Sequence, residues 1–354
     1  MQAAEQNMDS VVLVNLIEAT VMFGNLVVKD VHAFVIKGGF ECQEDLAASL
    51  VNLYAKCRDI LSAREVFDSI HCKNVVLWTS MLNGYVECGC PDNATAMLDS
   101  MLCANVEPNK ATVIAVISAC ANLGSANLGE RVEEHVIAMG LQSDLQVSTG
   151  LIDMYCKCGS IQRARKIFDG VTCRDLAVWS SMINGYACNG QGSEAVTLFN
   201  EMQNGGVRLE AIVFTHVLTA CNHSALIDEG LHCFHSMMVE YGIEPSTEHY
   251  MCMVDLLCKA GVVSCAMKFF KQMPVQMRKQ VLAPLINAHS AHCADSSIEF
   301  VSEELLNMDS QNSGHCVLIP SCLGKCKKAR NYRALIRKQG LVKEPGWSYI
   351  ELGG

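Results

Sequence analysis

The chain of 354 residues carries a formal charge of −10, and half of its residues are hydrophobic. This hydrophobic content argues against disorder, and no run approaches the roughly 18 consecutive apolar residues of a membrane span. The acidic balance disfavours extensive contact with phosphates, which need Lys and Arg, but net charge does not exclude a neutral or basic face. The segment from Lys325 to Lys343 has eight Lys and Arg and no Asp or Glu.

Twenty cysteines raise the question of disulfides or zinc. Disulfide frameworks belong to short secreted chains, and the opening MQAAEQNMDS has no basic segment followed by an apolar one, so we expect no secretory signal. No two cysteines have the C-x-x-C spacing of a zinc site. We therefore interpret the cysteines as small buried apolar residues in a reducing compartment, and we predict no metal site and no cofactor.

The sequence repeats itself with an offset of 101 residues. The residues that recur at this offset are Tyr54 and Tyr155, Phe67 and Phe168, Trp78 and Trp179, Tyr85 and Tyr186, and Cys120 and Cys221. A sequence of this kind is normally a stack of repeated structural units.

Each unit reads as a helical hairpin. Leu151, Met154 and Tyr155 have helical spacing, and the segment ARKIF repeats that spacing after a turn. Gly159 suits the end of the first helix, where a left-handed residue is tolerated. Because neither helix can bury its apolar stripe alone, neighbouring hairpins must stack.

The hairpin pattern divides the chain into units of 31 to 36 residues. An opening hairpin covers roughly residues 10–43, and the following units are residues 44–74, 75–109, 110–144, 145–175, 176–210, 211–246 and 247 onward. The pattern loosens from about Met273. We therefore predict two domains, a repeat array over residues 10–274 and a C-terminal region over residues 275–354.

The alternation of 31 and about 35 residues, with the signatures NGY, SAC and MYCKCG, resembles the plant pentatricopeptide-repeat proteins. The match is to their subclass built from triplets of P, L and S repeats. TEHY followed by MVDLLCKAG, and KEPGWSYIEL near the end, resemble the C-terminal E region of that subclass. Tetratricopeptide arrays are the nearest alternative, but they keep a fixed period of about 34 residues.

The resemblance implies an all-α fold, a right-handed superhelical solenoid of stacked helix-turn-helix repeats. It also implies binding of single-stranded organellar RNA, parallel to the chain, with one base per repeat. In the family, the fifth residue of the first helix and the last residue of the repeat read the base edge, and apolar residues of adjacent repeats sandwich the base.

The family pattern assigns two selective pairs to this chain. Thr79 with Asn109 is the combination that goes with adenine, and Thr149 with Asp175 is the combination that goes with guanine. The repeat between them offers Ile114 and Asp144, from which little selectivity is expected. The predicted core is therefore adenine, any base, guanine.

Two further pairs depart from the family pattern. Ser180 pairs with Glu210, where Asn or Asp is usual, so its base is unassigned. Ala48 pairs with Asn74, and Ala cannot hydrogen-bond a base. For all these positions the alternative is an ordinary solvated or capping residue.

Trp78 and Trp179 directly precede Thr79 and Ser180, the fifth residues of their first helices, at which a base would be read. Since a helix turns about 100° per residue, we expect both indoles to pack between hairpins rather than to stack on bases.

Many relatives with an E region edit organellar transcripts from cytidine to uridine. That chemistry needs an H-x-E…P-C-x-x-C zinc site, and this sequence contains no such motif. The resemblance therefore implies that the protein is not an enzyme. It would be an address factor that recruits a deaminase-bearing pentatricopeptide-repeat protein or another editing factor.

The C-terminal region is about three residues shorter than the family pattern between Cys322 and Glu344. Its basic run either binds a partner or contacts phosphates near the 3′ side of the RNA, or it is a solvated helix face. The residues concerned are Lys325, Lys327, Lys328, Arg330, Arg333 and Arg337.

Two other functions stay open. The chain could stabilise, splice or process a transcript without editing, or it could be a protein-binding helical scaffold. The resemblance places it in an organelle, the mitochondrion or the chloroplast with the mitochondrion favoured, although no transit peptide is visible.

Overall fold

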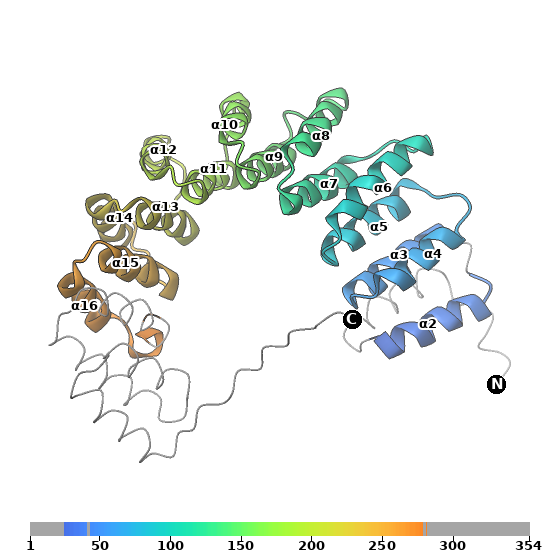
Figure 1. Ribbon diagram of the computed structural model, residues 1–354, viewed down its shortest axis with the longest axis horizontal. Helices are drawn as coiled ribbons and strands as arrows, with labels where there is room; N and C mark the ends of the chain where they lie inside the picture. Colours follow the sequence, from blue (N-terminus) through green and yellow to red (C-terminus); the bar gives the residue numbers. More distant parts are fainter. Residues whose placement is uncertain (1–24, 41–42, 279–280, 282–354) are drawn as a thin grey trace, which may run out of the picture. The chain divides into compact units, whose positions relative to one another are not determined.

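The computed structural model describes residues 25–40, 43–278 and 281. These residues form α-helices joined by short turns, and this part of the chain contains no strand (Figure 1). None of its helices is long and apolar enough to cross a membrane.

The helices alternate as the first and second helix of successive hairpins. The first helices are α3 (Glu44–Lys56), α5 (Val75–Glu87), α7 (Lys110–Leu123), α9 (Leu145–Lys157), α11 (Leu176–Cys188), α13 (Ala211–Ser224) and α15 (Thr247–Lys259). The second helices are α2 (Asn25–Lys37), α4 (Ile60–Ser69), α6 (Pro91–Cys103), α8 (Ala126–Ala138), α10 (Ile161–Gly170), α12 (Gly192–Asn204), α14 (Ile227–Val239) and α16 (Val263–Gln272).

The register predicted from the sequence is confirmed, because every repeat from residue 44 onward begins at the first residue of a first helix. Local chemistry explains the boundaries. The side chains of Asn74 and Asn109 cap α5 and α7, which satisfies backbone N–H groups that have no partner inside the helix. After α9 the chain turns at Gly159, whose φ of 73° is left-handed and favours glycine.

An aromatic pair recurs in the core at the 101-residue offset. Phe67 meets Trp78 edge to face at 4.9 Å, and Phe168 meets Trp179 in the same way at 5.1 Å. Both indoles are 7% exposed. The prediction that they pack between hairpins is confirmed, since each phenylalanine lies on a second helix and each tryptophan on the next first helix.

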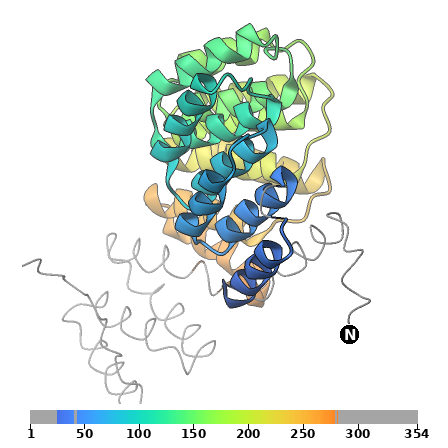
Figure 2. The same ribbon diagram turned by 90° about the vertical axis from the view of Figure 1, so that its right-hand side faces the viewer.

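The chain divides into two compact units, Met1–Gly185 and Tyr186–Gly354. In the first unit, α3, α5, α7 and α9 pack side by side in one layer, and each also packs against its own second helix (Figures 1 and 2). In the second unit, α13 packs against α12, α14 and α15, and α15 packs against α16. Within the first unit, each of these first helices is thus held on several sides, and the second helices form the other layer.

The cysteine interpretation is correct for part of the set. Cys120, Cys156, Cys221, Cys233 and Cys258 are buried, and burial raises the pKa of the Cys120 thiol to about 11 and that of Cys221 to about 12. The interpretation is wrong for four exposed cysteines, which lie in turns or at the last residue of a helix. These are Cys72, Cys103, Cys173 and Cys188. Among the described residues no cysteine is in a disulfide, and no group could hold a metal ion.

Candidate functional site

The candidate site is a pair of positions that recurs in each repeat. One is the fifth residue of the first helix, and the other is the last residue of the repeat. We call these two residues the reading pair. The last residue directly precedes the next first helix, so the same side chain can cap that helix and face a ligand.

The last residues cap the next helix in three of the predicted pairs. Oδ1 of Asn74 accepts from the backbone N–H of Leu77 at 2.9 Å, and Oδ1 of Asn109 accepts from Thr112 at 2.9 Å. Oδ1 of Asp175 accepts from the N–H of Val178 at 3.0 Å. Capping uses one oxygen, so it fixes the side chain and leaves Nδ2 of each Asn, or Oδ2 of Asp, for another partner.

Glu210 differs from these three. It precedes α13 with an extended backbone, but its side chain makes no capping hydrogen bond, and it is exposed. Its longer side chain is therefore not held by a capping hydrogen bond as the shorter ones are. The residue that departs from the family pattern is thus also the one that does not cap the next helix.

The fifth residues differ in accessibility. Thr149 is partly exposed, and its hydroxyl donates to the carbonyl of Leu145 at 2.6 Å. Ala48, Thr79 and Ser180 are buried, with 4%, 7% and 8% of their surface exposed. Among the four predicted fifth residues, Thr149 is thus the most accessible to a base, and the base-reading roles of all four stay predictions.

Asp144, the last residue of the repeat with Ile114, is engaged on both carboxylate oxygens. Oδ1 accepts from the backbone N–H groups of Gln146 and Val147 at 3.0 and 3.1 Å. Oδ2 lies 2.6 Å from Nζ of Lys110, the first residue of the same repeat. The Lys110 ammonium, assisted by the backbone donors, holds the pKa of Asp144 below its ordinary value. This repeat therefore offers an aliphatic side chain and a carboxylate that already has its partners.

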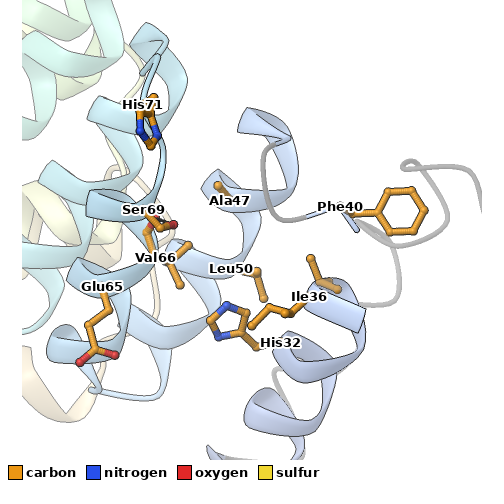
Figure 3. A pocket seen from close by; sticks show the side chains of 10 residues that line it. His32, Ile36, Phe40, Ala47, Leu50, Glu65, Val66, Ser69 and His71 are labelled. Carbon is orange, nitrogen blue, oxygen red and sulfur yellow. Dashed lines mark hydrogen bonds between the residues drawn. The ribbon is translucent and has the colours of Figure 1, made fainter. Parts of the chain in front are cut away.

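A cavity of about 390 Å³ lies elsewhere, between α2, α3 and α4. Figure 3 shows His32 and Ile36 of α2 on one side and Glu65 and Val66 of α4 on the other. Burial lowers the pKa of His32, which the negative charge of Glu65 opposes. The imidazole already meets the Tyr54 hydroxyl at 3.0 Å, so His32 has a partner within the protein, and we take the recurring reading pairs as the better candidate.

Profiles of repeat families match several of the hairpins. The PPR repeat family matches residues 73–122, and the PPR repeat matches residues 48–75, 147–175, 177–207 and 241–274. Pentatricopeptide repeat-containing protein At5g56310 of Arabidopsis thaliana is 32% identical over 360 residues, which cover 92% of this chain and 68% of that one. The chain belongs to the pentatricopeptide-repeat family.

Other pentatricopeptide-repeat proteins of Arabidopsis are longer than this chain. At4g30700 is 37% identical over 326 residues, which cover 91% of this chain and 41% of that one. At3g11460, which is named as mitochondrial, is 32% identical and is covered over 53% of its length. The chain thus spans about half the length of such relatives.

The fold is that of a solved pentatricopeptide-repeat structure. The crystal structure of PPR10 in complex with an 18-nt psaJ RNA element has a TM-score of 0.67, with 16% identity, over 88% of this chain and 48% of that chain. The crystal structure of PPR10 from maize also gives a TM-score of 0.67. The prediction of stacked helix-turn-helix repeats is confirmed.

A further hairpin, residues 211–246, has a pair of residues at the same two positions, for which the sequence predicted no role. Its fifth residue is Thr215 and its last residue is Ser246. Both are partly exposed, and both contact the buried imidazole of His249. The repeat register alone could have located this pair, but nothing in the sequence indicated that one histidine connects its members.

The C-terminal predictions lie almost entirely outside the described residues. Of the predicted C-terminal region, residues 275–354, the structure describes only residues 275–278 and 281. The basic run is not among them. Lys325, Lys327, Lys328, Arg330, Arg333 and Arg337 all fall outside the described residues.

Proposed function

We propose that this pentatricopeptide-repeat protein binds single-stranded RNA and reads one base per repeat through its reading pairs. The observation that carries the proposal is the capping geometry. Asn74, Asn109 and Asp175 are held at the same point of three hairpins, with one polar atom each left over. The crystal structure of PPR10 in complex with an 18-nt psaJ RNA element supports the RNA binding in this proposal.

The proposed core of the target is adenine, any base, guanine, read by residues 75–175 in chain order. Thr79 with Asn109 reads the adenine, and Thr149 with Asp175 reads the guanine. The middle repeat adds little selectivity, which agrees with the engagement of Asp144 by Lys110.

The biological role that we propose is that of an address factor for cytidine-to-uridine editing. In this proposal the chain is of the subclass with P, L and S repeats and an E region, and it is not itself an enzyme. The E region would engage a deaminase-bearing pentatricopeptide-repeat protein or another editing factor. We place the protein in the mitochondrion, for which the mitochondrial names of At3g11460, At1g06140 and At3g26782 are the support.

RNA binding is tested by titrating the purified chain with a random single-stranded RNA pool and with a duplex of the same length. We expect the single strands to bind and the duplex to compete weakly, because base edges must be accessible for reading. If neither RNA binds, and the chain instead retains other proteins, it is a helical scaffold.

Editing is tested separately, in a line that lacks the protein. Loss of editing at one cytidine, with the transcript at its normal level, supports the address role. A fall in transcript level or a splicing defect without loss of editing would instead assign the protein to RNA stabilisation or processing.

A further inference from the structure

Two buried polar residues occupy the same position in different repeats, the third residue of a first helix. They are Thr112 in α7 and His249 in α15, with exposures of 0% and 1%. In the other first helices that follow a predicted reading pair, this position is aliphatic and equally buried. Those residues are Leu77, Val147, Val178 and Val213. Burying a polar side chain is unfavourable unless it is hydrogen-bonded, so the contacts of these two residues need an explanation.

Thr112 connects both members of the preceding reading pair. Its hydroxyl lies 2.7 Å from Oγ1 of Thr79 and 3.0 Å from Oδ1 of Asn109. It also accepts from the backbone N–H of Asn109 at 3.3 Å. We infer that the third residue of the following first helix is a positioning residue that fixes which polar atoms the reading pair presents to a base. This inference rests on the proposed RNA binding.

The hydrogen bonds of Thr112 determine whether Thr79 and Asn109 present a donor or an acceptor. The single hydroxyl proton of Thr79 goes either to the carbonyl of Val75, at 2.8 Å, or to Thr112. In both cases the proton stays inside the protein, so Thr79 meets a base only as an acceptor. Asn109 has Oδ1 occupied by the N–H and hydroxyl of Thr112, so it presents the Nδ2 donor.

In the inferred arrangement the Thr79 acceptor faces the exocyclic group of the base and the Nδ2 donor of Asn109 faces the ring nitrogen, which complements an edge that carries an amino group beside a ring nitrogen acceptor. Adenine and cytosine have that edge, whereas guanine and uracil have a carbonyl beside a ring N–H. Thr112 therefore favours the first two bases over the other two at this repeat. Thr149 lacks such a connection, because Val178 takes the equivalent place.

His249 has the same role for the pair formed by Thr215 and Ser246. The backbone N–H of Ser246 donates to Nδ1 at 3.0 Å, so the imidazole proton is on Nε2, which donates to the carbonyl of Ala211 at 2.9 Å. The Ser246 hydroxyl lies 2.7 Å from Nδ1, and Oγ1 of Thr215 lies 3.1 Å from Nε2.

These contacts leave two acceptors in that repeat. The Ser246 hydroxyl accepts from the backbone N–H of His249, and its proton shares the single lone pair of Nδ1 with the backbone N–H of Ser246. The Thr215 hydroxyl donates to the carbonyl of Ala211 at 3.3 Å. A base edge with two donors, as guanine has, complements this pair. Residues 211–246 are thus a further base-reading repeat, two nucleotides to the 3′ side of the proposed guanine.

The test is selection of the full chain on random single-stranded RNA, with the unmodified protein, Thr112→Val and Thr112→Ser compared. Valine fills the same buried position in α9 and α11, so Thr112→Val should fold. We expect it to reduce the preference for adenine or cytosine at the nucleotide of residues 75–109 by roughly three- to tenfold, the effect of about one hydrogen bond. Thr112→Ser keeps the hydroxyl and should keep the preference.

A structural defect would lower binding to all sequences alike, so two readouts serve as controls. Total affinity for the pool and the preference at the nucleotide of residues 145–175 should not change in Thr112→Val. His249→Leu should in turn flatten only the preference at the nucleotide of residues 211–246.

The outcomes separate this inference from the proposed function. If the unmodified protein selects no base at any position, the proposed function fails. If it selects a base at the nucleotide of residues 75–109 and Thr112→Val selects it equally well, RNA reading stands and the inference is overturned. Loss of the preference in Thr112→Ser as well would also overturn it, because the hydroxyl would then not be the determinant.

Discussion

Residues 44–109 and 145–210 are two copies of one sequence pattern at an offset of 101, and they differ where a ligand would be read. The aromatic core residues are identical, as in the pairs Phe67 with Trp78 and Phe168 with Trp179. The reading residues all differ. Ala48, Asn74, Thr79 and Asn109 of the first copy correspond to Thr149, Asp175, Ser180 and Glu210 of the second. The comparison teaches that the hairpin fold constrains the core and leaves the reading pairs to vary.

The largest effect should come from removing the shared aromatic core. Phe67→Ala and Phe168→Ala each delete a ring that is at most 2% exposed and that packs on a tryptophan, and each should destabilise the array by about 3–5 kcal/mol. Urea unfolding of both variants checks this. Leu61→Ala, at a side chain 77% exposed, is the control and should change stability by under about 0.5 kcal/mol. If the two phenylalanine variants lost unequal amounts of unfolding free energy, the two copies would not have equivalent cores.

The two copies should differ in how much space a glycine has where two first helices come into close contact. A Cβ added at Gly185 would lie 2.1 Å from Sγ of Cys156, whereas one added at Gly84 would lie 3.1 Å from Cβ of Ala55, the counterpart of Cys156. We expect Gly185→Ala to cost about 1–3 kcal/mol and Gly84→Ala to cost less, measured by urea unfolding. Adding Cys156→Ala to Gly185→Ala makes the second copy like the first, so it should recover part of the loss. A double variant no more stable than Gly185→Ala alone would contradict this explanation.

Much of the fold could be predicted from the sequence, because hairpin boundaries depend on local signals that repeat. Capping residues and left-handed glycines such as Gly159 mark the helix ends whatever the neighbours are. The environment of the reading pairs could not be predicted. The contact of Thr79 with Thr112, and that of Lys110 with Asp144, join residues more than 30 positions apart. Such contacts depend on how two hairpins approach each other, for which the sequence pattern has no signal.

The next effect concerns the last residues of the two copies. Asn109 caps α7 through its side chain, whereas its counterpart Glu210 makes no capping hydrogen bond. Asn109→Ala should therefore cost about 1 kcal/mol, and Glu210→Ala should be nearly neutral, both by urea unfolding. Asp175→Ala should resemble Asn109→Ala, since Asp175 also accepts from the following helix. Equal costs at Asn109 and Glu210 would show that the capping difference has no energetic consequence.

The smallest effect is acid sensitivity at the start of the second copy. Asp144 has a lowered pKa because of Lys110, whereas its counterpart, Gln43, is uncharged. The lowered pKa means that the unfolded chain takes up this proton first, so the stabilisation is present above the ordinary Asp pKa of about 3.9 and is lost as the pH falls below it. Asp144→Asn keeps an oxygen for the cap, and it should make stability less dependent on pH below about 4. Unfolding of both proteins between pH 3 and pH 7 measures this. An unchanged slope would show that the Lys110 contact has no net effect, as is common for partly exposed ion pairs.

The central claim is that variable pairs on a constant fold read bases, and Thr149→Asn tests it most directly. Thr149 is the most accessible of the four predicted fifth residues, and the family pattern that assigns guanine to Thr with Asp implies uracil for Asn with Asp. Selection on random single-stranded RNA should give adenine, any base, guanine for the unmodified chain. With Thr149→Asn, guanine should change to uracil at that position and at no other. The same selected sequence from both proteins, or a change at a different position, would contradict the account.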